Sequence, residues 1–256
     1  REAVGLEFAL IRLIGPQTSL TVSYRPELVR LDAAEVLFCT NLLVCNPEDV
    51  SILEDANWLS PVGLSFSRNL ANNVLNPSRG YSVVLEIEHA SRWTGSNFRY
   101  DRVVAEGTLY SGLGRSGVLA ARLRGGWVGA GAFKALLQTP GPVDVIHPQK
   151  RFYAGGANSV RGFAQGRLGP RVLTVDPVRL LSTVPQGAGC DPTELVDLSC
   201  SVVSMDEGRF VPRPTGGTRV LEANLELRFP LGLSFEWATF TDIGQVWGGY
   251  EGVDLS

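Results

Sequence analysis

The chain has 256 residues, of which 44% are hydrophobic and 19% are charged, and its formal net charge is −3. This slightly acidic balance argues against a nucleic-acid partner, which would require a basic surface. No run of about 18 consecutive apolar residues occurs, and this excludes a transmembrane helix. The chain does not begin with Met, and both of its ends lie near strand patterns, so we expect a fragment of a longer protein.

Alternation of apolar and polar residues with period two is the main structural signal, and it predicts β-strands. The first segment, 2–14, is strand-like but alternates weakly, as does 98–111. Clean alternation begins at six further points, which are Leu20, Val62, Tyr81, Leu119, Leu221 and Leu233. The sequence therefore predicts an all-β chain with eight strands and no helix.

Alternation alone fits either a soluble sandwich, whose polar face is outside, or a membrane barrel, whose polar face is the lumen. The predicted connections mostly alternate between short and long, as in outer-membrane barrels with short turns at one end and long loops at the other. They lie near 15–18, 32–59, 71–79, 91–97, 112–115, 130–218 and 230–232. Aromatic residues near strand ends would suit membrane-interface girdles; they are Tyr24, Trp58, Trp93, Tyr110, Trp127 and Trp247.

The longest connection contains an extended motif between Lys150 and Pro170. It has an RFYAGG lead, a VRGF core formed by Val160, Arg161, Gly162 and Phe163, and an LGP end. This string resembles the signature of the BamA/TamA family of outer-membrane assembly proteins. In that family the corresponding loop is the sixth extracellular loop, which folds back into the barrel lumen. The resemblance thus implies an antiparallel transmembrane β-barrel with a long lumen-inserted loop at about 130–218.

Three further segments resemble motifs of the same family. Residues 76–80 resemble its PTRG-like turn, residues 222–230 resemble a strand with a lumen-facing Glu, and Phe240, Asp242 and Gly244 resemble its FxDxG motif. The resemblance covers essentially the whole chain. It implies one partial barrel domain, 1–256, with about eight of the family's sixteen strands, from about the sixth to the thirteenth. The first and last strands and the periplasmic POTRA domains would then be missing.

The residue types around the VRGF core indicate how the loop is held. A guanidinium confined in a barrel requires carboxylate partners in forked geometry, and strand parity points both Glu226 and Asp242 to the lumen. We therefore expect Arg161 to contact one or both carboxylates. The alternative, that the two carboxylates merely line a wet lumen, stays open.

Glycines and an aromatic residue are expected to support this contact. Gly155, Gly156 and Gly162 allow sharp turns, and Gly155, Gly156 and Gly244 are the supporting glycines of the predicted site. We expect the Phe163 ring to pack on the inner wall. The apolar strand faces, including Leu225 and Phe235, are expected to contact lipid, whereas Asn224 on the opposite face is expected to tolerate Arg far better.

The four cysteines form two local pairs, Cys39/Cys45 and Cys190/Cys200. Pairs in loops favour disulfides in an oxidising compartment, with four free thiols as the alternative. Cys190 and Cys200 also resemble a pair that some family members carry in this loop.

The sequence offers no convincing enzyme site. It has two histidines, His89 and His147, without a defensible Ser/Asp arrangement. The Cys39/Cys45 pair lacks further zinc ligands, and the Gly155-Gly156 run lacks the Gly-Lys-Ser/Thr of a phosphate loop. We therefore expect no catalytic residues, no metal and no cofactor.

By resemblance, the chain would help to fold and insert β-barrel proteins into the outer membrane of a Gram-negative-type bacterium, without ATP. Its partners would be outer-membrane lipid, unfolded client barrels and, through the missing POTRA domains, other assembly subunits. The alternatives are a translocator of the two-partner-secretion type and a barrel fused to a patatin-like hydrolase. A passive porin would have no reason to carry the motif set. The sequence does not separate BamA from TamA.

Overall fold

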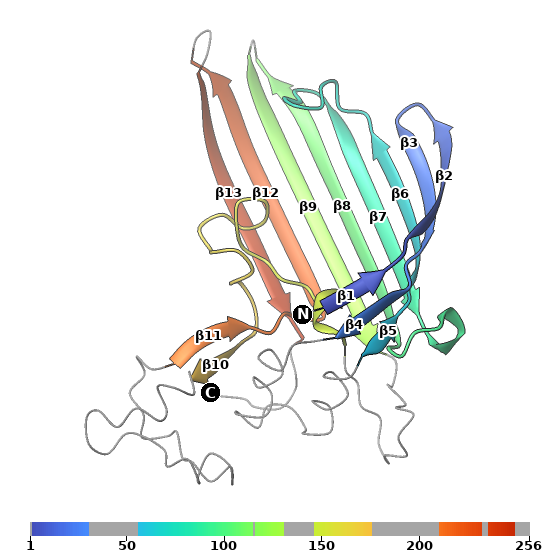
Figure 1. The fold of residues 1–256 in the computed structure, drawn as a ribbon. Helices are drawn as coiled ribbons and strands as arrows, with labels where there is room; N and C mark the ends of the chain where they lie inside the picture. Colours follow the sequence, from blue (N-terminus) through green and yellow to red (C-terminus); the bar gives the residue numbers. More distant parts are fainter. Residues whose placement is uncertain are drawn as a thin grey trace, which may run out of the picture.

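The structure, a computed structural model, describes residues 2–30, 56–114, 116–130, 146–175, 210–231 and 235–248. Its main element is a curved antiparallel sheet of eight strands in the order β13-β12-β9-β8-β7-β6-β3-β2 (Figure 1). These strands are β2 Phe8–Gly15, β3 Thr18–Tyr24, β6 Val62–Asn69, β7 Gly80–Ala90, β8 Tyr100–Leu113, β9 Gly117–Ala130, β12 Arg219–Pro230 and β13 Glu236–Trp247. The predicted all-β class and the eight predicted strands are confirmed.

Two 3-10 turns, η1 Arg92–Thr94 and η2 Pro148–Lys150, are the only helical elements in the described ranges. The described part of the chain has no helix that is long and apolar enough to cross a membrane.

The first two predicted strands are each divided. β1 Glu2–Gly5 and β4 Glu27–Arg30 leave the main sheet and pair with each other, and β4 also pairs with β5 Asn57–Leu59. Pro26 marks the break, because proline has no N–H to donate to the ladder. Its carbonyl accepts a hydrogen bond from the Leu6 N–H at 3.0 Å. The long connection 130–218 also contains a hairpin of β10 Arg171–Val175 and β11 Phe210–Pro214.

The connections of the main sheet sort only partly by length between its two ends. The strand ends that are joined by 16–17, 70–79, 114–116 and 231–235 lie at the upper end in Figure 1, and those joined by 25–61, 91–99 and 131–218 lie at the opposite end. The predicted alternation of short and long connections holds except that 70–79 is slightly longer than 91–99.

The four cysteines belong to two of the longer connections. Cys39 and Cys45 fall within 25–61, and Cys190 and Cys200 fall within 131–218. All four lie outside the described residues. The two predicted disulfides, Cys39–Cys45 and Cys190–Cys200, are therefore not tested by the structure and stay predictions.

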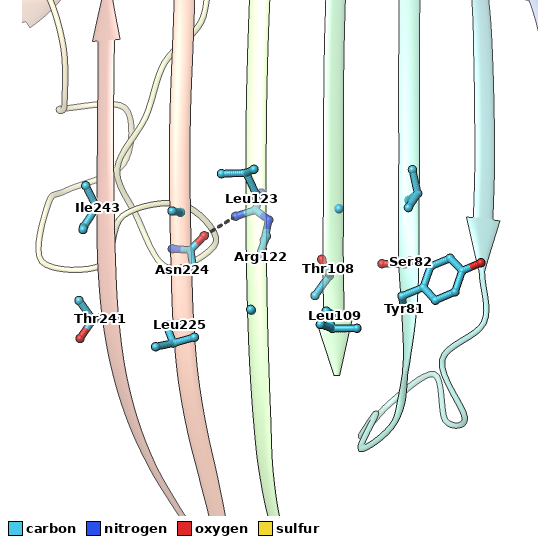
Figure 2. A pocket seen from close by; sticks show the side chains of 14 residues that line it. Tyr81, Ser82, Thr108, Leu109, Arg122, Leu123, Asn224, Leu225, Thr241 and Ile243 are labelled. Atoms are coloured by element: carbon cyan, nitrogen blue, oxygen red, sulfur yellow. Dashed lines mark hydrogen bonds between the residues drawn. The ribbon is translucent and has the colours of Figure 1, made fainter. Parts of the chain in front are cut away.

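Strand register separates an apolar face from a polar one. Leu109, Leu123, Leu225 and Ile243 share one face and line a shallow hollow of about 650 Å³ (Figure 2). The opposite face carries the polar residues of the alternation and is covered by the segment 146–170, drawn in yellow in Figure 1. Tyr110 departs from the girdle prediction, because it lies on the polar face, next to Leu109 on the apolar one.

The hydrophobic core lies between the polar face of the sheet and the first part of that segment. Phe152, 2% exposed, packs so closely that a Cβ added to Gly126 would lie 2.6 Å from its ring. Glycine at 126 therefore permits the contact. The other core residues come from the three-stranded sheet of β1, β4 and β5, from the eight-stranded sheet, called the wall below, and from the loop segment 146–170. They include Val29, Leu59, Tyr100, Val128, Ile146, Ala154, Val220 and Val246.

Candidate functional site

The loop that carries the VRGF core is closed at its base and turned by glycines. Isolated bridges join Phe152 to Gly217 and Ala154 to Leu168. Beyond them the backbone reaches φ angles of 104° at Gly155, 101° at Gly156 and 97° at Gly162. Such angles are strained for residues with a Cβ, which explains why glycine stands at these three positions.

Arg161 lies at the tip of this loop, between two carboxylates of neighbouring strands. Its Nε and Nη2 donate to the two oxygens of Asp242 on β13, at 2.7 Å and 2.8 Å. Its Nη1 donates to Oε2 of Glu226 on β12 at 2.6 Å. The two predicted partners are thus brought to a single guanidinium, in the forked geometry that only arginine offers.

The environment of Arg161 keeps its charge fixed. The hydrogen bonds to Asp242 raise the pKa of Arg161 above its usual range, although burial acts in the opposite direction. The guanidinium carbon lies 3.6 Å from the centre of the Phe240 ring, a cation–π stack on the same wall. Charge, fork and stacking together define one orientation for the loop tip.

A second group of hydrogen bonds holds the backbone around Arg161. The Arg161 N–H donates to Asp242 at 2.9 Å. The Asn224 amide donates to Asp242 at 2.9 Å and to the Ser159 carbonyl at 2.7 Å. Arg122 donates to the Asn158 carbonyl at 2.9 Å and to the Asn224 side chain at 3.2 Å (Figure 2). The tip is therefore attached to β9, β12 and β13.

The contacts of Asn224 lead us to expect a larger cost for Arg at this position than strand parity alone predicted. Parity correctly placed it on the polar face, but it contacts the loop tip rather than open lumen. An Arg there would lie beside Arg122 and would replace a side chain that makes three hydrogen bonds.

The polar network continues below Asn224 to a completely buried carboxylate. Glu222 is 0% exposed, accepts a hydrogen bond from the Ser159 hydroxyl, and lies 3.2 Å from Nη1 of Arg124. The same Ser159 oxygen accepts from the Gly155 N–H at 2.9 Å. A buried carboxylate requires hydrogen-bond or charged partners, and Ser159 and Arg124 supply them. Through Ser159, Glu222 also connects the turn at Gly155 to β12.

Gly244 allows the loop to approach β13. A Cβ at this position would lie 2.5 Å from Cγ2 of Val160, which is 4% exposed. Phe163 differs from the expectation, since 48% of its surface is exposed. Val160 and Phe152, together with Ile146 and Ala154, are the buried apolar residues of the described part of this loop instead.

A cavity of about 430 Å³ lies between the loop tip and the polar face, lined among others by Arg122, Arg161 and Glu226. Arg228 closes it toward the turn between β6 and β7. Its guanidinium donates to the Asn76 side chain and to the Pro77 carbonyl, both at 2.8 Å. The turn that resembles the family's PTRG motif thus reaches across to β12, which also carries Glu226.

The contacts of this site hold the loop against the sheet. In the described ranges, no group of three or more His, Cys, Asp or Glu side chains could hold a metal. His147 is buried against Phe98 with ring centres 5.0 Å apart, and His89 lies 2.7 Å from Asp101 at the strand end.

Several residues of the site were not identified from the sequence. Period-two parity could have included Glu222 and Asn224, which share a face with Glu226. Ser159 and Phe240 are next to residues that the motifs highlighted, but their contacts depend on the path of the loop.

The comparisons with known proteins agree with this geometry. Residues 3–255 match the Omp85 superfamily domain. A stretch of 116 residues is 33% identical to "Outer membrane protein assembly factor BamA" of Neisseria meningitidis, covering 45% of this chain and 13% of that protein. The crystal structure of BamA from Haemophilus ducreyi lacking POTRA domains 1-3 is similar with a TM-score of 0.62. That likeness, at 18% identity, covers 96% of this chain and 42% of the other, and it shows the fold alone. Because the match spans nearly its whole length, the chain belongs to the Omp85 superfamily and is a protein of the Gram-negative outer membrane.

Proposed function

We propose that this chain is the barrel portion of a factor that folds and inserts β-barrel proteins into the outer membrane, without ATP, metal, cofactor or catalytic residues. Residues 1–256 would form one partial barrel domain. The family-level role in outer-membrane protein assembly is supported by the superfamily match and by the Neisseria relative. The observation that carries the finer proposal is the contact of Arg161 with both Glu226 and Asp242.

The contact supports a role as a latch. Separating a buried or half-buried ion pair leaves a charge without a partner, which is strongly unfavourable. The loop tip should therefore stay on β12 and β13 while the rest of the barrel deforms. A fixed tip would keep the lumen occupied and would hold these strands in register with β9. The apolar face would meanwhile anchor the wall in lipid.

The proposed partners follow from these surfaces. Lipid would contact the face that bears Leu123, Leu225 and Ile243, because exposed apolar side chains dominate there. The clients would be unfolded β-barrel proteins. Other assembly subunits would bind through POTRA domains, three of which were left out of the Haemophilus ducreyi BamA in the similar structure.

The test is to introduce Arg161→Ala into the full-length protein as the sole copy in cells, and to measure the steady-state amount of folded client barrels. We expect a marked loss. Arg167→Ala is the matched control, because this exposed arginine of the same loop binds only a carbonyl, that of Pro212, among the described residues. If Arg161→Ala sustains client assembly as well as Arg167→Ala does, the latch is not required and the proposal is wrong.

A further inference from the structure

A buried carboxylate lies on the wall well away from Arg161. Glu88 on β7 is 6% exposed and faces the inside of the sheet. It accepts hydrogen bonds from Nη2 of Arg25 at 2.9 Å, from Nζ of Lys150 at 2.9 Å and from the Tyr100 hydroxyl at 3.2 Å. Tyr100 belongs to β8 of the wall, and Arg25 directly follows β3. Lys150 is the only donor of the three that comes from the VRGF loop.

Lys150 is held tightly at the beginning of the loop. Its side chain is 14% exposed, and its ammonium lies 5.6 Å from the centre of the Tyr100 ring. Burial lowers the pKa of Lys150, while the charge of Glu88 opposes that shift. The next residue, Arg151, is 6% exposed and donates to the carbonyls of Ile146 and Thr215. An ammonium group as buried as that of Lys150 keeps its charge only beside an anionic partner, here Glu88.

We propose that Lys150 is a positioning residue, which anchors the start of the loop to β7 and β8 through Glu88 while Arg161 anchors its tip to β12 and β13. Strands β8 and β9 separate β7 from β12 in the sheet. The loop is therefore attached at two places on different strands and cannot pivot about one of them. That the start of the loop must be held for client assembly rests on the function proposed above.

The charges around Glu88 suggest a variant that removes the loop's contact with Glu88 but leaves this carboxylate with its other partners. Arg25, Lys150 and Arg102 all act on Glu88 as cations. In Lys150→Met the carboxylate keeps Arg25, Tyr100 and the field of Arg102, so the wall stays satisfied. Glu88→Gln would instead leave three cations around a neutral amide, and it is a poorer probe.

The test is limited digestion of the folded full-length protein by an arginine-specific protease, with mass spectrometry of the fragments. Cleavage after Arg151 reports release of the loop's start, and cleavage after Arg161 reports release of its tip. Lys150→Met should speed the appearance of fragments that begin at Phe152 roughly tenfold or more, the effect of about 1.4 kcal/mol. Cleavage after Arg161 should change little. Lys150→Arg adds a cleavage site of its own, so this variant is scored by fragments that begin at Arg151 as well as by those that begin at Phe152. Both kinds of fragment should stay rare.

Tyr100→Phe is the control for general loosening, because it removes a Glu88 contact without touching the loop's cation. It should leave cleavage after Arg151 close to the wild-type rate. The anchor is disproved if Lys150→Met gives no faster cleavage than wild type, or if Tyr100→Phe speeds cleavage as much as Lys150→Met does.

A client-assembly assay on the same variants separates the two proposals. Lys150→Met should lower assembly and Lys150→Arg should retain it, with Arg161→Ala as the reference. A loosened loop with normal assembly in Lys150→Met would disprove the functional part of this inference. Normal assembly in Arg161→Ala would contradict the proposed function, while the cleavage pattern would still decide whether Lys150 anchors the loop.

Discussion

Arg161 and Asp242 meet edge to edge, with two nearly parallel hydrogen bonds of 2.7 Å and 2.8 Å. Lysine at 161 would keep the charge but could not form both bonds. We expect Arg161→Lys to cost roughly 1.5–3 kcal/mol, the value of a charged hydrogen bond, and Arg161→Ala to cost roughly 3–5 kcal/mol. The measurement is the urea concentration at which the compact electrophoretic form of the full-length barrel is lost. Equal stability of the two variants would contradict a role for the fork.

The two carboxylates should contribute unequally. Asp242 has a side chain only 2% exposed and accepts bonds from Arg161 and Asn224, whereas the Glu226 side chain is 27% exposed and makes one bond to Arg161. We expect Asp242→Asn to cost roughly 3 kcal/mol or more and Glu226→Gln roughly 1 kcal/mol or less, because exposure weakens an ion pair. Urea denaturation of both variants checks the order, and the reverse order would refute this assignment.

Gly244 should tolerate no side chain while the loop is in place. A Cβ there would lie 2.5 Å from Val160, so Gly244→Ala should cost about 1–3 kcal/mol by overpacking and should expose the loop tip to protease. Gly125→Ala is the matched control, because its Cβ on the apolar face of β9 would meet nothing within 4 Å. Similar effects of both substitutions would mean that Val160 does not pack on Gly244 in the folded protein.

The apolar face should respond to charge as a lipid-facing surface does. Leu225→Arg, in the middle of β12, should cost roughly 2–4 kcal/mol. Ser65→Arg on the polar face of β6 should cost far less, because its strand partner is Glu86. Phe235 precedes β13 and is 76% exposed, so it lies at a turn and its replacement by Arg should be mild. Refolding into lipid vesicles and titration with denaturant measures all three; equal costs at 65 and 225 would favour a soluble sandwich.

Much of the architecture could be predicted from the sequence because a strand's two faces must meet different surroundings. Alternation along 221–229 was enough to place Leu225 and Glu226 on opposite faces, and the motifs indicated which strands lie side by side. The break at Pro26 was missed, since the apolar pattern from Leu20 to Leu28 runs through it.

The parts of the site that could not be predicted depend on the path of the loop. Lys150 and Glu88 are 62 positions apart in the chain, and nothing in either local pattern pairs them. Phe163 belongs to the recognised VRGF core, yet the backbone turn at Gly162 leaves its ring half-exposed. A motif identifies which residues matter together, but the direction of each side chain is decided by backbone angles that alternation does not encode.

The contact of Arg228 with the turn at Asn76 and Pro77 joins positions 152 residues apart in the chain. This contact links β12 directly to the turn that precedes β7, across the inner side of the sheet. While it persists, the four strands β7, β8, β9 and β12 must stay curved. The bend of this wall is therefore an intrinsic property of the described strands and does not depend on ring closure by others. A barrel whose seam parts would keep this arc in shape, and the strain of opening would be concentrated elsewhere along its circumference.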